Sequence, residues 1–215
     1  TSLEEKEVGD VLAANNPRFF ANNVLNPTFT FDTFVNGPSN QEAYQAAITI
    51  ACNPGTSYNP LFIYSPSGLG KTHLLTSIGN HIRAKSPQIK VLYTSSQDFV
   101  NEFIAFCKTD TSTGALLQYI MKFDVLLVDD IQLMKDKKRS LEFFFNVFQY
   151  FTQNNKQIVL TSDRTPADLD GIDERLVTRF TNGLSVSISP PDIGICVEIL
   201  KKKLVNEGHS VDFID

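Results

Sequence analysis

The glycine-rich segment 65–72 combines residue types that bind phosphate. It reads Ser-Pro-Ser-Gly-Leu-Gly-Lys-Thr and lies between the apolar run 61–64 and a helix-like stretch. A strand that ends in such a turn and opens into a helix directs backbone N–H groups at one point, where an anion is favoured. Lys71 can then reach the β- and γ-phosphates of a nucleotide, and the Thr72 hydroxyl can bind magnesium. The segment therefore predicts a nucleoside-triphosphate site of the Walker A type.

One position departs from the strict form of this motif. The usual pattern begins with glycine, whereas this chain has Ser65 there. Because serine is small, we expect the loop to close around phosphate in the same way.

Two adjacent carboxylates follow a second apolar run. Asp129 and Asp130 come directly after residues 125–128, Val-Leu-Leu-Val. Charge at the end of a buried strand is costly unless a cation or hydrogen bonds compensate it. We expect Asp129 to bind Mg²⁺ beside Thr72 and Asp130 to orient the water that attacks the γ-phosphate. Alone, such a pair is often a helix cap or a turn, but together with the loop it predicts one shared site.

A further acidic residue stands at the end of another strand-like run. Asp163 follows residues 157–162 and could contact the γ-phosphate or the attacking water. The alternative is a turn aspartate that hydrogen-bonds its own backbone ahead of Pro166.

Two arginines suggest contact with a second subunit. Arg175 and Arg179 stand four residues apart and therefore share one face of a helix. An arginine offered to a neighbour's triphosphate stabilises the transferring phosphoryl group and makes hydrolysis depend on assembly. The alternative is ordinary pairing with Asp173 or Glu174, worth only a few tenths of a kcal/mol on a surface.

The elements that must position these residues alternate along the chain. Helical stretches alternate with strand-like runs, which favours parallel strands joined by crossover helices. We expect five such strands, at 61–64, 90–95, 125–130, 157–162 and 184–188. We expect helices at 41–52, 97–106, 114–122 and 140–151, the last apolar nearly all round. The fold class is therefore α/β, a five-stranded parallel sheet flanked by helices, with its ligand at the carboxyl ends of the strands.

Composition limits the classes of partner. The chain has 215 residues and a net charge of −5, so it is no general polyanion binder. Two basic runs, 135–139 and 201–203, could serve locally, although such runs are usually solvated faces. Three scattered cysteines and three histidines show no zinc spacing. No apolar run approaches the roughly 20 residues that span a bilayer, and we expect a cytoplasmic protein.

Taken together, the motifs resemble the AAA+ domain of the bacterial replication-initiator family DnaA. The resemblance covers almost the whole chain after Pro27, although the family usually has two glycines where Ser65 and Pro66 stand. It implies a P-loop NTPase of the AAA+ type that holds ATP or ADP with Mg²⁺. The residues implied to contact the nucleotide are Val35 and Asn40 beside the base, then Gly68, Leu69, Gly70, Lys71, Thr72 and His73. Asp163 is the implied first sensor and Arg179 the implied arginine finger.

The resemblance also implies a nucleic-acid partner. ATP-bound subunits of the family assemble into a filament on origin DNA, bind single strands and help to melt the duplex. Val100, Lys137 and Arg139 occupy the matching strand-binding positions, and such contacts would weaken with salt. Contact with the replicative helicase or its loader would come from regions outside this chain. The main alternative is a DnaA-like regulator or helicase loader with the same ATPase core.

The resemblance also divides the chain. We expect a linker over residues 1–27, the AAA+ domain over 28–208 and the start of a truncated lid at 209–215. Without a complete lid, we expect weak nucleotide binding and slow hydrolysis. A nucleotide-gated scaffold that hardly hydrolyses ATP stays open as a further alternative, and a metabolic P-loop kinase is less favoured because no acceptor site can be named.

Overall fold

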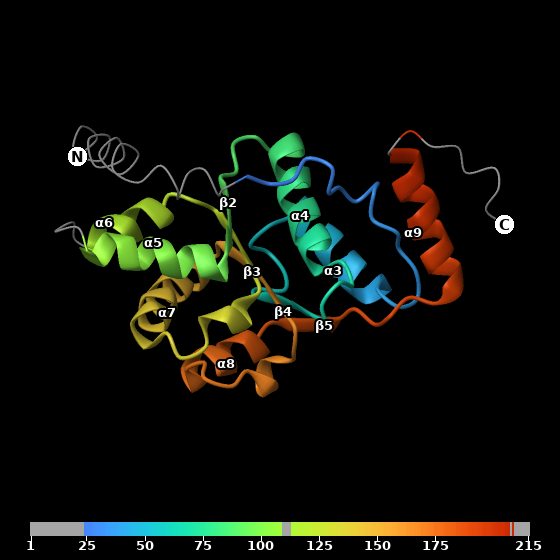
Figure 1. The fold of residues 1–215 in the computed structure, drawn as a ribbon. Helices are drawn as coiled ribbons and strands as arrows, with labels where there is room; N and C mark the ends of the chain where they lie inside the picture. Colours follow the sequence, from blue (N-terminus) through green and yellow to red (C-terminus); the bar gives the residue numbers. More distant parts are fainter. Residues whose placement is uncertain (1–23, 109–112, 207, 209–215) are drawn as a thin grey trace.

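The computed structural model describes residues 24–108, 113–206 and 208 (Figure 1). None of the helices in these ranges is both long and apolar enough to cross a membrane. The elements alternate between helix and strand for most of the chain. In order they are α3 (Gln41–Cys52), β1 (Leu61–Tyr64), α4 (Lys71–Lys85), β2 (Val91–Ser95), α5 (Ser96–Lys108), α6 (Thr113–Ile120), β3 (Val125–Asp129), η1 (Ile131–Met134), α7 (Lys138–Gln153), β4 (Gln157–Ser162), η2 (Pro166–Asp168), α8 (Glu174–Thr181), β5 (Leu184–Ser187) and α9 (Ile193–Asn206).

The five strands form one parallel sheet in the order β2-β3-β4-β1-β5. β4 lies between β1 and β3, and the register pairs Ile63 with Thr161 and Val128 with Leu160. Since all the strands are parallel, the residues that follow β1, β3 and β4 meet at one edge of the sheet. The predicted five-stranded parallel α/β fold is confirmed.

Helices cover both faces of the sheet (Figure 1). Alternate residues of each strand point to opposite faces, and because both faces are covered, residues 61–63 of β1 and 125–128 of β3 are all buried and apolar. Leu61 and Ile63 pack with the α3 and α4 side, whereas Phe62 packs with the side that holds α5, α6, α7 and α8. Two apolar clusters therefore hold the sheet in place from both sides.

Helix α7 corrects one expectation. It runs beyond the predicted range 140–151 at both ends, and it is not apolar nearly all round. Glu142 and Asn146 are exposed, while Phe144 and Phe148 are buried against the sheet. The helix is amphipathic, with one face toward the core and one toward solvent.

The chain packs against the domain ahead of the expected boundary at residue 28. Leu25 is only 5% exposed and belongs to the cluster on the α4 side. Asn80 of α4 donates from Nδ2 to the carbonyls of Asn26 and Phe29, both at 2.8 Å. The rest of the expected linker and residues 209–215 lie outside the described residues.

Candidate nucleotide site

The loop between β1 and α4 depends on two glycines. Gly68 and Gly70 have φ values of 86° and 96°, the left-handed region that other residues rarely enter. The carbonyl of Gly70 accepts the N–H of Leu74 at 2.9 Å, which starts α4. A Cβ at Gly70 would also lie 3.1 Å from Phe34 Cε2. The first N–H groups of α4 have no partner within the helix and can bind an anion.

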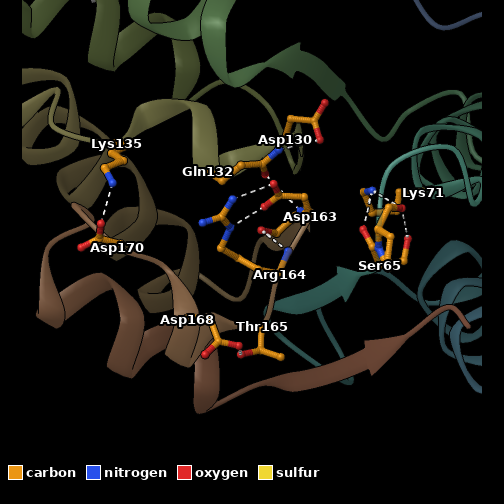
Figure 2. Close-up of polar contacts among 12 residues, drawn as sticks. Ser65, Lys71, Asp130, Gln132, Lys135, Asp163, Arg164, Thr165, Asp168 and Asp170 are labelled. Atoms are coloured by element: carbon orange, nitrogen blue, oxygen red, sulfur yellow. Dashed lines mark hydrogen bonds and ion pairs between the residues drawn. The ribbon is translucent and has the colours of Figure 1, made fainter.

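Lys71 lies over this loop rather than in solvent. Its side chain is almost fully buried, and Nζ donates to the carbonyls of Ser65 (2.7 Å) and Pro66 (3.2 Å) (Figure 2). Ser65 is not among the described residues with positive φ, so its backbone does not require glycine. The departure from the strict motif at Ser65 therefore leaves the loop geometry intact.

Asp129 at the end of β3 is bound from several sides. Thr72 Oγ1 donates to its Oδ2 at 2.7 Å, and Thr161 Oγ1 donates to its Oδ1. Tyr93 Oη donates to Oδ2 at 3.4 Å. The carboxyl is only 6% exposed, and burial raises its pKa, while the hydrogen bonds from Thr161 and Thr72 act in the opposite direction. This is the hydrogen-bonded, partly desolvated carboxylate that a magnesium site needs.

Thr161 was missed by the sequence analysis. Besides its bond to Asp129, its hydroxyl accepts the N–H of Asp130 at 2.9 Å. It can do so because β4 lies between β1 and β3 in the sheet, which the order along the chain does not reveal. The available signal was a hydroxyl residue near the end of the strand-like run 157–162.

Gln132 joins the two other acidic residues. Its Nε2 donates to Asp130 Oδ1 at 3.0 Å, and its Oε1 accepts the N–H of Asp163 at 3.3 Å. The Asp163 carboxylate turns to the neighbouring Arg164, which donates from Nε (2.7 Å) and Nη2 (2.8 Å), as Figure 2 shows. These bonds lower the pKa of Asp163. Asp163 thus pairs with its neighbour in the sequence, much as expected of a turn residue. Its contact with phosphate stays a prediction.

The two arginines of α8 differ in their surroundings. Arg175 donates from Nη2 to Asp173 Oδ2 at 2.7 Å, so the expected alternative of local pairing describes this arginine. Arg179 has no ion pair among the described residues. Both guanidinium carbons lie over the ring of Phe145 on α7, at 4.6 and 4.8 Å from its centroid.

Comparison with known proteins gives the family. A family profile described as the bacterial DnaA ATPase domain matches residues 25–187. The chain belongs to this DnaA family. It is 51% identical to the chromosomal replication initiator protein DnaA of Enterococcus faecalis over 180 residues. This aligned region makes up 84% of this chain and 40% of that protein. The DnaA protein of Streptococcus mutans is 47% identical over 193 residues, 89% of this chain and 42% of that protein. The chain thus spans about two fifths of the length of these relatives.

Solved DnaA structures share the fold. Domain III of the Thermotoga maritima DnaA protein superimposes with a TM-score of 0.84 at 40% identity, over 88% of this chain and 79% of that one. A DnaA replication initiator bound to AMPPCP and single-stranded DNA gives a TM-score of 0.80 at 36% identity, over 88% of this chain and 58% of that one. The fold and the family that the sequence predicted are confirmed.

Val35 and Asn40, the residues expected beside the nucleotide base, hold a loop of this DnaA-family chain in shape. Asn40 is buried, donates from Nδ2 to the Val35 carbonyl (2.9 Å) and accepts the Gly37 N–H on Oδ1 (2.9 Å). The amide of Asn40 is therefore used within the loop 35–40. Contact of Val35 and Asn40 with the base stays a prediction.

The side chain of His73 makes contacts outside the phosphate loop, and its expected contact with the nucleotide stays a prediction. Its Nε2 donates to the Thr30 carbonyl at 3.0 Å, and its ring stacks on Phe29 with centroids 4.6 Å apart. The side chain therefore points toward the segment before α3 and not into the phosphate loop, so a nucleotide contact is left to its backbone. Burial lowers the pKa of His73, which keeps the ring neutral at pH 7.

The three residues expected to contact DNA separate into two groups. Lys137 and Arg139 are exposed at the start of α7, as a strand-binding role requires. Val100 is only 2% exposed and packs in the core with Phe99 and Phe103. The burial of Val100 does not favour contact of this side chain with DNA, and that contact stays a prediction; Ile104, on the same helix, is exposed instead.

Proposed function

We propose that this chain is the ATP-binding and ATP-hydrolysing domain of a chromosomal replication initiator. The observation that carries the proposal is the meeting of Lys71, Thr72 and Asp129 at one edge of the sheet. The family and its relatives support it, although the chain spans only part of their length. In this proposal the bound nucleotide controls assembly on origin DNA.

The residues present fit a magnesium nucleotide. The Thr72 hydroxyl and the Asp129 carboxylate already lie 2.7 Å apart, and both are the oxygen ligands that Mg²⁺ prefers. The described residues hold no group of three or more His, Cys, Asp or Glu that could enclose a metal. This agrees with magnesium, which is usually held by one or two carboxylates together with phosphate oxygens. The ion would supply positive charge that stabilises the phosphates.

The remaining residues have separate tasks in this proposal. Lys71 leaves the carbonyls of Ser65 and Pro66 to bind the β- and γ-phosphates, while the N–H groups of residues 68–72 surround them. Asp130 orients the attacking water, and Gln132 holds the Asp130 carboxylate in place. Asp163 contacts the γ-phosphate once it is freed from Arg164. Hydrolysis is slow because the neighbouring subunit must complete the site.

Arg179 completes the site of the next subunit. It lacks an ion-pair partner among the described residues, whereas Arg175 is already paired with Asp173. A guanidinium with free donors can bind a triphosphate from outside and stabilise the transferring charge. ATP-bound subunits then form a filament on origin DNA, and Lys137 and Arg139 bind the single strand. A replication initiator of this kind acts at the chromosome in the cytoplasm.

The test is nucleotide-dependent assembly of the full-length protein on single-stranded DNA, measured by sedimentation with ATP or ADP. We expect assembly with ATP and not with ADP. Lys137→Ala with Arg139→Ala should abolish DNA binding and leave ATP binding unchanged, while Lys122→Ala serves as a control for general loss of charge. Assembly that ignores the nucleotide would contradict the proposal.

A DnaA-like regulator or helicase loader is the second candidate. Loader structures such as the DnaC helicase loader share only the fold, at 18% identity. The initiator is favoured because eight relatives at 46–51% identity are chromosomal replication initiator proteins. If the full-length protein assembled with a helicase and not on origin DNA, the second candidate would replace the first.

A further inference from the structure

Both arginines of α8 contact the aromatic ring of Phe145 on α7. The ring is half-buried on α7, where Glu142 and Asn146 are exposed. The guanidinium carbon of Arg175 is 4.6 Å from the ring centroid and that of Arg179 is 4.8 Å away. Both distances are within the range of a favourable cation–π interaction.

The helix that carries Phe145 is packed firmly against the core. The neighbours of Phe145 on α7, Phe144 and Phe148, are only 0% and 1% exposed. Phe148 contacts Phe180 of α8 with ring centroids 5.7 Å apart, and Phe180 in turn contacts Phe62 of β1 at 5.6 Å. The positions of α7 and α8 relative to each other are therefore set by the core, and Phe145 presents its ring at a fixed distance from α8.

The charges around the Phe145 ring give the two arginines different roles. Two guanidinium groups near one ring repel each other, but Asp173 neutralises Arg175 through a two-pronged contact, with Nε–Oδ1 at 3.0 Å and Nη2–Oδ2 at 2.7 Å. This pairing lowers the cost of bringing Arg179 to the same ring. Arg179 is then held by a contact that uses none of its N–H donors, all of which stay available to an acceptor.

We propose that Phe145 is a positioning residue that orders the Arg179 side chain for the triphosphate of the neighbouring subunit, an inference that rests on the proposed function. Arginine loses considerable conformational entropy when its side chain binds in one geometry. If the side chain is already ordered in the monomer, less entropy is lost on assembly. Phe145 itself does not touch the nucleotide.

The experiment compares Phe145→Leu with Phe145→Tyr in the full-length protein. Leucine fills much of the same volume without an aromatic ring, whereas tyrosine keeps the ring. We expect Phe145→Leu to weaken ATP-dependent assembly on oligo(dT) about two- to fivefold, the range of an exposed cation–π contact, and Phe145→Tyr to behave as the wild type. Binding of a fluorescent ATP analogue to the monomer should be the same in all three proteins.

A second measurement reports on Arg179 directly. NMR relaxation of its Nε–H group in the monomer should show faster motion in Phe145→Leu than in the wild type or Phe145→Tyr. Equal motion in all three would overturn the inference. So would a loss of assembly from Phe145→Leu that comes with weaker binding of the ATP analogue to the monomer, since the ring would then act on the fold in general.

Arg179→Ala distinguishes this inference from the proposed function. If Arg179→Ala abolishes assembly while Phe145→Leu leaves both assembly and Arg179 motion unchanged, the role of Phe145 is refuted and the arginine finger stands. If Arg179→Ala assembles normally with ATP, the arginine finger itself is refuted, and the inference fails with it.

Discussion

At the scale of single residues, the site depends on how one buried carboxylate is satisfied. Asp129 would be costly at the end of a buried strand, and hydroxyl groups from two different elements compensate it. Thr72 does so from α4 and Thr161 from β4, so that the carboxyl ends of β3 and β4 and the start of α4 are joined. Both hydroxyls therefore stabilise the fold as well as the site.

Thr161→Val should weaken both stability and magnesium binding. Valine has nearly the same shape but offers no donor to Asp129 and no acceptor to the Asp130 N–H. We expect the free energy of unfolding in urea to fall by about 1–3 kcal/mol. Without the Thr161 bond the pKa of Asp129 should rise further, so Mg²⁺-dependent ATP binding should weaken more at pH 6 than at pH 8. Thr161→Ser, which keeps the hydroxyl, is the matched control, and equal behaviour of the two variants would refute this role.

At the scale of elements, the loop between β1 and α4 combines backbone and packing requirements. Gly68 and Gly70 both take left-handed φ values, yet their surroundings differ. A Cβ at Gly68 would meet nothing within 4 Å, whereas one at Gly70 would meet the buried ring of Phe34 at 3.1 Å. The segment before α3 thus closes over the start of α4.

The two glycines should therefore respond differently to alanine. We expect Gly68→Ala to cost about 1–2 kcal/mol of stability, from backbone strain alone. Gly70→Ala should cost more, because Phe34 must also shift. Urea unfolding of both variants measures the difference, and a Gly70→Ala variant as stable as Gly68→Ala would show that Phe34 yields without cost.

At the scale of the whole molecule, long-range contacts join the chain before α3 to the rest of the domain. His73 of α4 bonds to Thr30 and stacks on Phe29. Lys202 of α9 donates to the carbonyls of Asp32 (2.7 Å) and Phe34 (3.3 Å). Segments far apart in the sequence therefore pack together over the start of α4. A change that breaks one of these contacts should lower the stability of the fold.

The stability of the molecule should fall in mild acid because of His73. Burial lowers the pKa of its ring in the folded state below the ordinary value of 6.5. Above pH 6.5 the ring is neutral in both states and costs nothing. Below it, the unfolded chain takes up a proton that the folded ring resists, so the free energy of unfolding falls until the pH passes the folded-state pKa.

Thermal unfolding at pH 7.5 and pH 5.5 measures this effect. We expect a larger drop in the midpoint for the wild type than for His73→Gln, which does not titrate and keeps a donor near Thr30. His81→Gln serves as the control for a histidine elsewhere on α4. Equal drops in the wild type and in His73→Gln would exclude His73 as the source.

Much of this architecture could be predicted because it is encoded locally. Glycines, a lysine and a hydroxyl at fixed spacing identify a phosphate loop, and apolar runs of strand length predict a parallel sheet. The ranges of β1, β4 and α3 agree with the sequence predictions. The prediction for β3 included Asp130, but the chain turns there with a φ of 55°.

The sequence by itself determined the family, the fold class, the phosphate loop and the acidic strand end, because each depends on residue types within a short window. Only the tertiary structure decided which hydroxyl completes the Asp129 site, that Val100 is buried, that His73 faces away from the loop, and that Phe145 lies beneath Arg175 and Arg179. The physical reason is that these facts depend on strand order and on which helix face meets the core. Both are fixed by contacts between residues far apart along the chain.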